Sequence, residues 1–125
     1  MLSTPVVVPP DAHRFWWEVQ QDWVAVGAAG VDPVTKHPDR VGDTSAVLRA
    51  SGLFTDPVVR RHRFDVVLSA AAYVPNLSTQ SGVKELPAAA QVEFLDRVER
   101  RVRSLGGTLV VHHLAVLVVA AAARR

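Results

Sequence analysis

The chain of 125 residues contains no cysteine, which excludes disulfide bonds and metal sites with thiolate ligands. None of its glycines forms a G-x-G turn, and no glycine-rich loop joins a predicted strand to a following helix. A phosphate or adenosyl cradle needs this strand–loop–helix order, because free backbone amides at the helix start must face the ligand. We therefore expect that this chain binds no nucleotide cofactor on its own.

A membrane-spanning run and a strong excess of one charge are also missing. The apolar segment 108–123 is shorter than the roughly 20 residues that cross a bilayer, and it contains His112 and His113. The first residues lack the basic start of a signal peptide. The net charge of +2 is too small to indicate a nucleic-acid partner. We expect a cytoplasmic protein that binds neither nucleic acid nor membrane.

The composition that remains is typical of a globular domain, with 49% hydrophobic and 21% charged residues. At this length we expect a single domain over residues 1–125. A complete doubly wound nucleotide-binding fold usually needs a longer chain. The expected domain is therefore large enough for a hydrophobic core but small for a whole enzyme of that class.

The three tryptophans stand close together near the N-terminus. A helix is predicted to open at Pro9-Pro10-Asp11, with Asp11 as its cap, and to end at Gly27 and Gly30. An apolar stripe at helical spacing is formed by Trp16, Val19, Trp23 and Val26. So much aromatic surface in one helix packs in the core, or it forms the wall of a ligand pocket or an interface.

Proline and glycine divide the middle of the chain. Residues 31–43 are predicted to be a loop, and residues 44–50 a short helix capped by Asp43 or Thr44 and closed by Gly52 in the left-handed conformation. Residues 58–68 are predicted to form a strand whose arginines, Arg61 and Arg63, suit a sheet edge. Residues 70–77 are predicted to be helical.

The clearest predicted helix starts at Pro87 and stops at Gly106. Its apolar stripe is Val92, Leu95, Val98, Val102 and Leu105. Acid–base pairs at four-residue spacing support its exposed side, namely Glu93–Arg97, Asp96–Arg100 and Glu99–Arg103. Residues 109–119 follow as a strand that is apolar on both faces, which predicts burial between two layers.

In their order, these segments resemble the C-terminal portion of class I S-adenosylmethionine-dependent methyltransferases that act on small molecules and close with a substrate lobe. The stretches that carry the resemblance are FWWEVQQDW, VDPVTKHPDR, LRASGLF, VVRRHRFDVVLS, LSTQSGVKELP, EFLDRVERRVRSLGG and TLVVHHLAVLVV. The resemblance implies an α/β fold, a partial Rossmann-like methyltransferase fold with about three to four helices and a terminal antiparallel strand pair. Residues 58–68 would be its edge-side strand.

The resemblance also implies a small-molecule substrate that lies under the tryptophan helix and residues 77–83. The candidate substrate-binding residues are Trp16, Trp17, Tyr73, Thr79 and Ser81. No catalytic residue is indicated, because methyl transfer depends chiefly on alignment and desolvation. S-adenosylmethionine is the cofactor of the parent family, and a partner polypeptide would have to supply the half that binds it. For Thr79 and Ser81 the alternative role is to cap the turn into the next helix.

A non-catalytic binding or dimerisation module is the alternative class of function. It would associate through the surface of Trp16, Trp17 and Trp23 and through the exposed edge of an incomplete sheet. The occupant of that surface would be a second copy or a partner chain.

Two further motifs do not indicate a functional site. The five histidines have no metal-binding spacing, and His112 and His113 should face opposite sides of a strand. The tripeptide His37-Pro38-Asp39 resembles the one that joins two helices in J-domain co-chaperones. Pro33 interrupts the helix that should precede it, so we expect a rigid loop in which Asp39 accepts hydrogen bonds.

Overall fold

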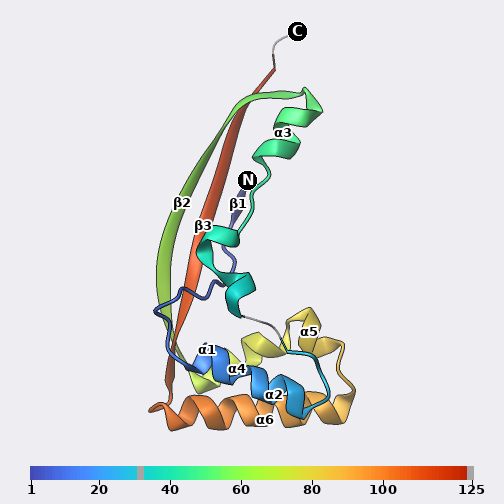
Figure 1. The fold of residues 1–125 in the computed structure, drawn as a ribbon, viewed down its shortest axis with the longest axis vertical. Coiled ribbons are helices and arrows are strands. Elements are labelled where there is room, and N and C mark those ends of the chain that lie inside the picture. The colour runs from blue at the N-terminus through green and yellow to red at the C-terminus, as the bar shows by residue number, and fades with distance from the viewer. Residues whose placement is uncertain (31–32, 124–125) are drawn as a thin grey trace.

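The computed structural model describes residues 1–30 and 33–123, so residues 31–32 of the predicted loop and the basic pair 124–125 lie outside the described part. A long antiparallel ribbon of two strands runs the length of the molecule, and most helices gather at one end of it (Figure 1). The fold is mixed α/β, as predicted, and every strand pair in the described residues is antiparallel.

The ribbon consists of β2 (Phe54–Ser69) and β3 (Thr108–Ala122), and the short β1 (Leu2–Ser3) pairs with the opposite edge of β3. The register of β2 and β3 is continuous from Val58 opposite Val119 to Ser69 opposite Thr108. The predicted antiparallel strand pair is therefore confirmed. The predicted strand 58–68 lies within β2, at the edge of the sheet, as expected from its arginines.

The predicted tryptophan helix is two short helices, α1 (Phe15–Glu18) and α2 (Gln20–Ala25). The prediction that it opens at Pro9-Pro10-Asp11 with Asp11 as cap is wrong. Pro9 and Ala12 form a turn instead, and the backbone N–H of Phe15 donates to Nδ1 of His13 at 3.0 Å. The histidine ring thus satisfies a free donor of the first helical turn.

Two 3₁₀ turns, η1 (Pro33–Lys36) and η2 (Pro38–Arg40), lead to the predicted short helix, α3 (Ser45–Ser51). Of its two candidate caps, Asp43 supplies the hydrogen bond, because its carboxylate accepts from the N–H of Ser45 at 2.8 Å. Gly52 closes the helix in the left-handed conformation, as predicted.

The second half contains α4 (Ala70–Ser78), α5 (Ser81–Lys84) and α6 (Ala88–Ser104). Residues 70–77 are helical as predicted, and the hydroxyl of Ser69 caps α4 by accepting from Ala72 N–H at 3.2 Å. The one-turn helix α5 was not predicted. With the split first helix, it makes the number of helices larger than the three to four expected by resemblance.

The long helix α6 begins after Pro87 as predicted, but its buried stripe differs in one place. Val92 is exposed and Phe94 is buried, whereas Val98 and Val102 are buried as predicted. Phe94 faces α2 and its ring packs on Trp23, with the ring centroids 4.1 Å apart. In its first half, the buried face of α6 is therefore the one that carries Phe94 and packs against α2. None of the helices in residues 1–30 and 33–123 is both long and apolar enough to cross a bilayer.

Two hydrophobic clusters lie at different heights along the ribbon. The helical end holds the larger one, which includes Phe15, Phe94, Val98, Val102, Leu109 and Val111. The distal cluster is formed by Val7, Leu114, Val116 and Val118, with Val41, Leu48 and Val59 packed against it. The strand β3 contributes to both clusters.

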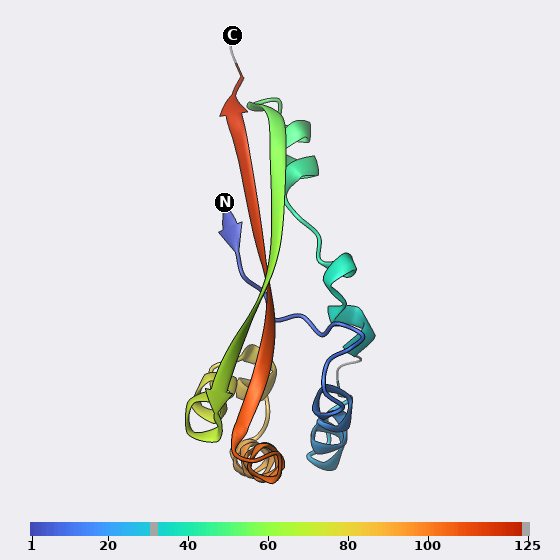
Figure 2. The ribbon, with the colours of Figure 1, turned by 90° about the vertical axis from the view of Figure 1, so that its left-hand side faces the viewer.

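The buried residues of β3 change parity between the two clusters. Leu109 and Val111 are buried near the helices, whereas Leu114, Val116 and Val118 are buried in the distal half. No bulge lies between them. The ribbon twists, and β2 and β3 cross midway in Figure 2, so opposite faces meet the covering segments at the two ends.

The prediction that residues 109–119 are buried between two layers is therefore wrong. Each face of β3 is covered along only half of its length, and Val110, Leu117 and Val119 remain exposed. The strand is apolar on both faces because each face takes part in a different cluster.

Candidate functional site

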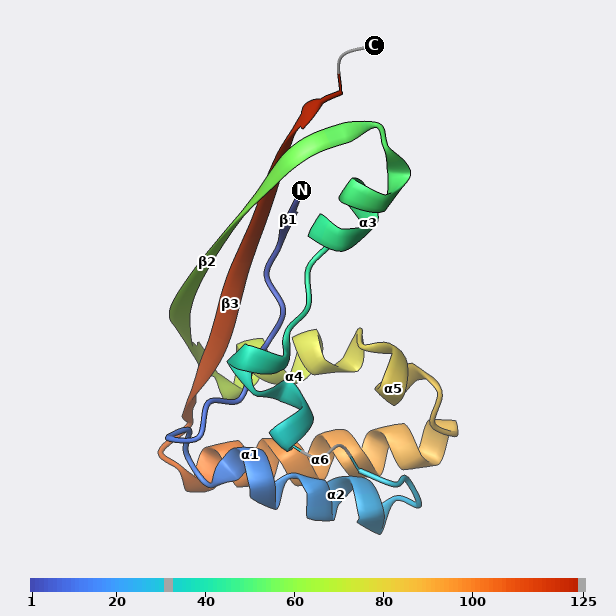
Figure 3. The same cartoon turned by 45° about the horizontal axis from the view of Figure 1, so that its top comes forward.

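A cavity of about 420 Å³ is lined by the tryptophan helices, α4, α5, α6 and the segment that leads from β1. Figure 3 shows how these helices are arranged at the helical end of the ribbon. This volume is within the range of small-molecule sites. Four aromatic side chains line it, Trp16, Trp23, Tyr73 and Phe94. The rest of its lining includes Val6, Val8, Val19, Pro33, Lys36, Leu77, Gln80, Ser81, Gly82 and Glu85.

The aromatic rings are held against one another by edge contacts. Trp16 meets Phe15 at a centroid distance of 5.1 Å and Tyr73 at 6.3 Å, both nearly perpendicular. A Cβ atom on Gly82 would lie only 3.4 Å from Cη2 of Trp23, so glycine at this position lets the indole ring lie directly against α5. These ring–ring contacts stabilise the wall of the cavity.

Two polar side chains of the cavity lack a partner among the residues that the structure describes. Neither the Tyr73 hydroxyl nor the Lys36 ammonium has a side-chain hydrogen bond or ion pair within the described residues. Burial raises the pKa of Tyr73 to about 12, so its hydroxyl remains a donor at neutral pH. Partial desolvation lowers the pKa of Lys36, although its residue as a whole is exposed at the rim of the cavity.

The indole Nε1 of Trp16 is buried and has no hydrogen-bond partner among the described residues. This N–H can only donate, and leaving such a donor unpaired costs about 1–3 kcal/mol. The ring forms part of the cavity wall, but Nε1 itself is covered. A ligand acceptor therefore reaches it only if the ring shifts.

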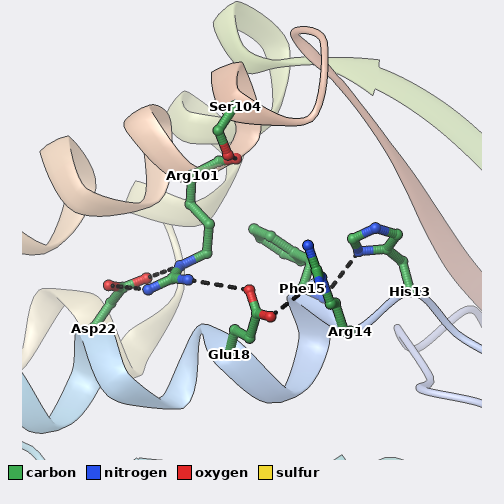
Figure 4. A network of polar contacts seen from close by, with 7 residues as sticks. All are labelled: His13, Arg14, Phe15, Glu18, Asp22, Arg101 and Ser104. Atoms are coloured by element: carbon green, nitrogen blue, oxygen red, sulfur yellow. Dashed lines mark hydrogen bonds and ion pairs between the residues drawn. The ribbon is translucent and has the colours of Figure 1, made fainter.

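An ion-pair network behind the cavity fixes the tryptophan helices to α6 (Figure 4). The guanidinium of Arg101 donates to both carboxylate oxygens of Asp22, at 2.8 and 2.9 Å, and to Glu18 at 3.3 Å. The hydrogen bond to Asp22, which is 2% exposed, raises the pKa of Arg101. The pair holds α2 at the position where Trp23 meets Phe94.

Sequence reasoning missed both residues of this pair. A signal was present, because Arg101 is the arginine of α6 that the predicted acid–base pairs leave out. The residue four positions before it is Arg97, a base, so its partner had to come from another element.

The structure brings three of the five candidate site residues together. Trp16 from α1, Tyr73 from α4 and Ser81 from α5 line the cavity. Trp17 lies on the outer side of the helix, where it is 37% exposed and lines a shallow depression. Thr79 is exposed and its hydroxyl donates to the carbonyl of Asn76 at 2.7 Å, at the end of α4. It does not cap α5, whose N-cap is Gln80, so the alternative role of capping the next helix is also wrong for Thr79.

The histidine motifs take structural roles. His112 contacts Asp65 at 2.7 Å, and His113 contacts the carbonyl of Thr4 at 3.0 Å on the other face. Within the ranges described, no three metal-binding side chains of His, Asp or Glu come together.

The tripeptide starting at His37 joins two 3₁₀ turns and not two long helices. The expectation that Asp39 accepts hydrogen bonds is wrong. Its backbone N–H donates to Nδ1 of His37 at 3.1 Å, and its carboxylate lies only 3.7 Å from that ring nitrogen.

The apolar surface that the structure exposes is not the tryptophan surface that was expected to associate with a partner. Trp16 and Trp23 face the cavity, so only Trp17 remains on the outside. A different apolar patch lies on one face of the distal sheet, across all three strands. We call it the distal patch, and its exposed members are Leu2, Val58, Leu117 and Val119.

Comparisons with known proteins leave these features without an assigned role. No protein-family model matches the chain. No curated protein matches it either.

Proposed function

We propose that the chain is the substrate-binding lobe of an S-adenosylmethionine-dependent methyltransferase that acts on a small molecule. The acceptor molecule is held in the aromatic cavity, and the chain is not active alone. The observation that supports this proposal is that Trp16, Tyr73 and Ser81, which are far apart in the sequence, line one cavity. The antiparallel β2–β3 pair agrees with the expected C-terminal portion of a partial Rossmann-like fold. The cytoplasmic location stays a prediction.

The cavity supplies what methyl transfer requires of a substrate site. Its aromatic walls exclude water and restrict the acceptor to few orientations, which lowers the entropic part of the barrier. S-adenosylmethionine supplies the methyl group when bound. No glycine-rich strand–loop–helix is present in the sequence, so the cofactor is held by a partner polypeptide.

Calorimetry tests the cavity. A panel of aromatic small molecules titrated into the chain should include ligands whose binding is weakened in Trp16→Ala and unchanged in Trp17→Ala, because only Trp16 lines the cavity. Circular dichroism confirms that both variants are folded. Equal loss of binding in both variants, or no binding by any member of the panel, contradicts a substrate site here.

A separate experiment tests whether a partner polypeptide is needed to bind the cofactor. Titration of S-adenosylmethionine into the chain alone should give no heat, and heat should return when the partner polypeptide is present. Tight binding of the cofactor by the chain alone contradicts the need for a partner. Absence of heat with a co-purified partner removes the enzymatic proposal.

The second candidate function is a dimerisation module, and the distal patch favours it. Pairing through the free edge of β2 would place Arg60, Arg61 and Arg63 of two copies near one another, which is repulsive. Stacking of two copies through the distal patch would cover Leu117 and Val119, and of these three arginines only Arg60, opposite Leu117, lies on that face.

Light scattering after size exclusion separates the two candidates. A dimer that Leu117→Lys converts to a monomer supports the module, with Val24→Lys as a control at an exposed apolar position elsewhere. A monomer at all concentrations contradicts it.

A further inference from the structure

We propose that the molecule bound in the aromatic cavity is a monoanion, an aromatic monocarboxylate, whose carboxylate is bound by Lys36 and the Tyr73 hydroxyl. This inference rests on the proposed function, since it names the class of substrate for the same site. It depends on three properties of the lining.

The first property is the aromatic wall. Trp16, Trp23, Tyr73 and Phe94 line the cavity together, and they contact one another at edges and tilted faces. A planar aromatic ring packs on such surfaces better than a flexible chain does. The cavity of about 420 Å³ has room for one fused ring system.

The second property is a pair of donors without acceptors. Lys36 and Tyr73 both line the cavity, and neither side chain hydrogen-bonds or ion-pairs with another residue in the part of the chain that the structure describes. Burial keeps the phenol protonated, and partial desolvation lowers the pKa of Lys36, which is exposed in part and can accept a ligand from the open side of the cavity. A carboxylate accepts from both groups and restores the charge balance of Lys36.

The third property limits the ligand to one negative charge. Glu85, the residue that ends α5, also lines the cavity, and no cation pairs with it within the described residues. A second carboxylate on the ligand would approach Glu85 and be repelled. Gln80 and Ser81 also line the cavity and offer neutral polar groups to the rest of the molecule.

Three probes test the inference by calorimetry, namely naphthoate, its methyl ester and naphthalene dicarboxylate. The acid should bind about tenfold or more tightly than the neutral ester, the expected effect of a charge-assisted hydrogen bond. The dicarboxylate should bind more weakly than the monoacid. In Lys36→Met the preference for the acid over the ester should disappear.

Lys84→Met is the matched control, because Lys84 lies on α5 but does not line the cavity. This variant should keep the full preference for the acid. Tyr73→Phe should reduce the preference without removing it.

The outcomes distinguish this inference from the proposed function. If acid and ester bind equally well, or if Lys36→Met keeps the preference, the inference is wrong while the site stands. If none of the probes and no other aromatic molecule binds, the proposed substrate site itself fails. If the dicarboxylate binds more tightly than the monoacid, the inference that the ligand carries a single negative charge is wrong.

Discussion

The guanidinium of Arg101 on α6 binds both carboxylate oxygens of Asp22 on α2, a residue 79 positions away in the sequence. Asp22 is almost fully buried, so Arg101→Ala would leave an unpaired carboxylate inside the protein. We expect a loss of about 2–4 kcal/mol in the free energy of unfolding, measured by urea denaturation. Arg101→Lys should restore only part of it, because an ammonium cannot bind both oxygens in the same way.

Arg103→Ala is the control for this measurement. Arg103 is on the same helix and pairs with Glu99 at 2.9 Å, but its side chain is 61% exposed. An exposed pair at this spacing is worth about 0.3–0.5 kcal/mol. Similar losses in both variants would contradict a special role for Arg101.

The change of buried face in β3 predicts a pattern among four valines. Val→Thr keeps the shape of the side chain but adds a hydroxyl, which costs about 1–2 kcal/mol where it is buried without a partner. Val111→Thr and Val118→Thr should show this loss in urea denaturation, because both residues are buried. Val110→Thr and Val119→Thr should stay within about 0.5 kcal/mol of the wild type. If β3 had a single buried face, the two destabilising substitutions would instead lie an even number of residues apart.

The turn between α6 and β3 requires glycine for its backbone conformation. Gly107 has a φ of +87°, and a Cβ added there would meet no other atom within 4 Å. Gly107→Ala should therefore cost about 1–2 kcal/mol through backbone strain alone, as measured by thermal or urea unfolding. Gly42→Ala is the control, because its surroundings are equally open and its φ is not positive. No difference between the variants would disprove the strain.

The phenol of Tyr73 should titrate late. It is the single tyrosine of the chain, so the ultraviolet absorbance of phenolate reports on this residue alone. Its pKa of about 12 in the folded protein lies above the 10.0 of an exposed tyrosine. The protonated phenol of Tyr73 therefore contributes its full stabilisation of the folded state below pH 10, and this contribution is lost as the pH rises toward 12. An absorbance midpoint near 10 while circular dichroism shows a folded chain would contradict the burial.

Filling the cavity from α5 should block ligand binding. A leucine at Gly82 would extend from a Cβ that already lies 3.4 Å from Trp23. We expect Gly82→Leu to weaken the binding of cavity ligands about tenfold or more in calorimetry, since it takes up the space of the ligand. Gly42→Leu lies outside the cavity and should bind normally. Unchanged binding in Gly82→Leu would place the ligand elsewhere.

The local signals of the sequence predicted several elements correctly. Pro87 and Gly106 delimit α6, and Gly52 ends α3, because these positions depend on backbone preferences that each residue carries by itself. The helical stripe also separated Trp16 and Trp23 from Trp17, which lies off it and is exposed. The resemblance added Trp17 as a site residue, and the simpler argument from spacing agrees better with the structure.

Other features depend on contacts between distant segments and could not be predicted. Lys36 reaches the cavity because the N–H of Val8 bonds to its carbonyl at 2.9 Å, which no local pattern shows. The N-terminal start of α1 is set by the ring of His13 and not by the acid at position 11. The faces of β3 could not be assigned, because apolar alternation does not tell how far a ribbon twists.

The adjacent pair His112-His113 is the point where the apolar alternation of β3 slips by one residue. A ribbon without twist would keep the same phase from end to end if one layer covered it. This one-residue shift in the pattern therefore reflects a half-rotation of the ribbon between the two hydrophobic clusters. Deleting either histidine would restore a regular phase, and the resulting chain would suit a flat hairpin that this molecule does not contain.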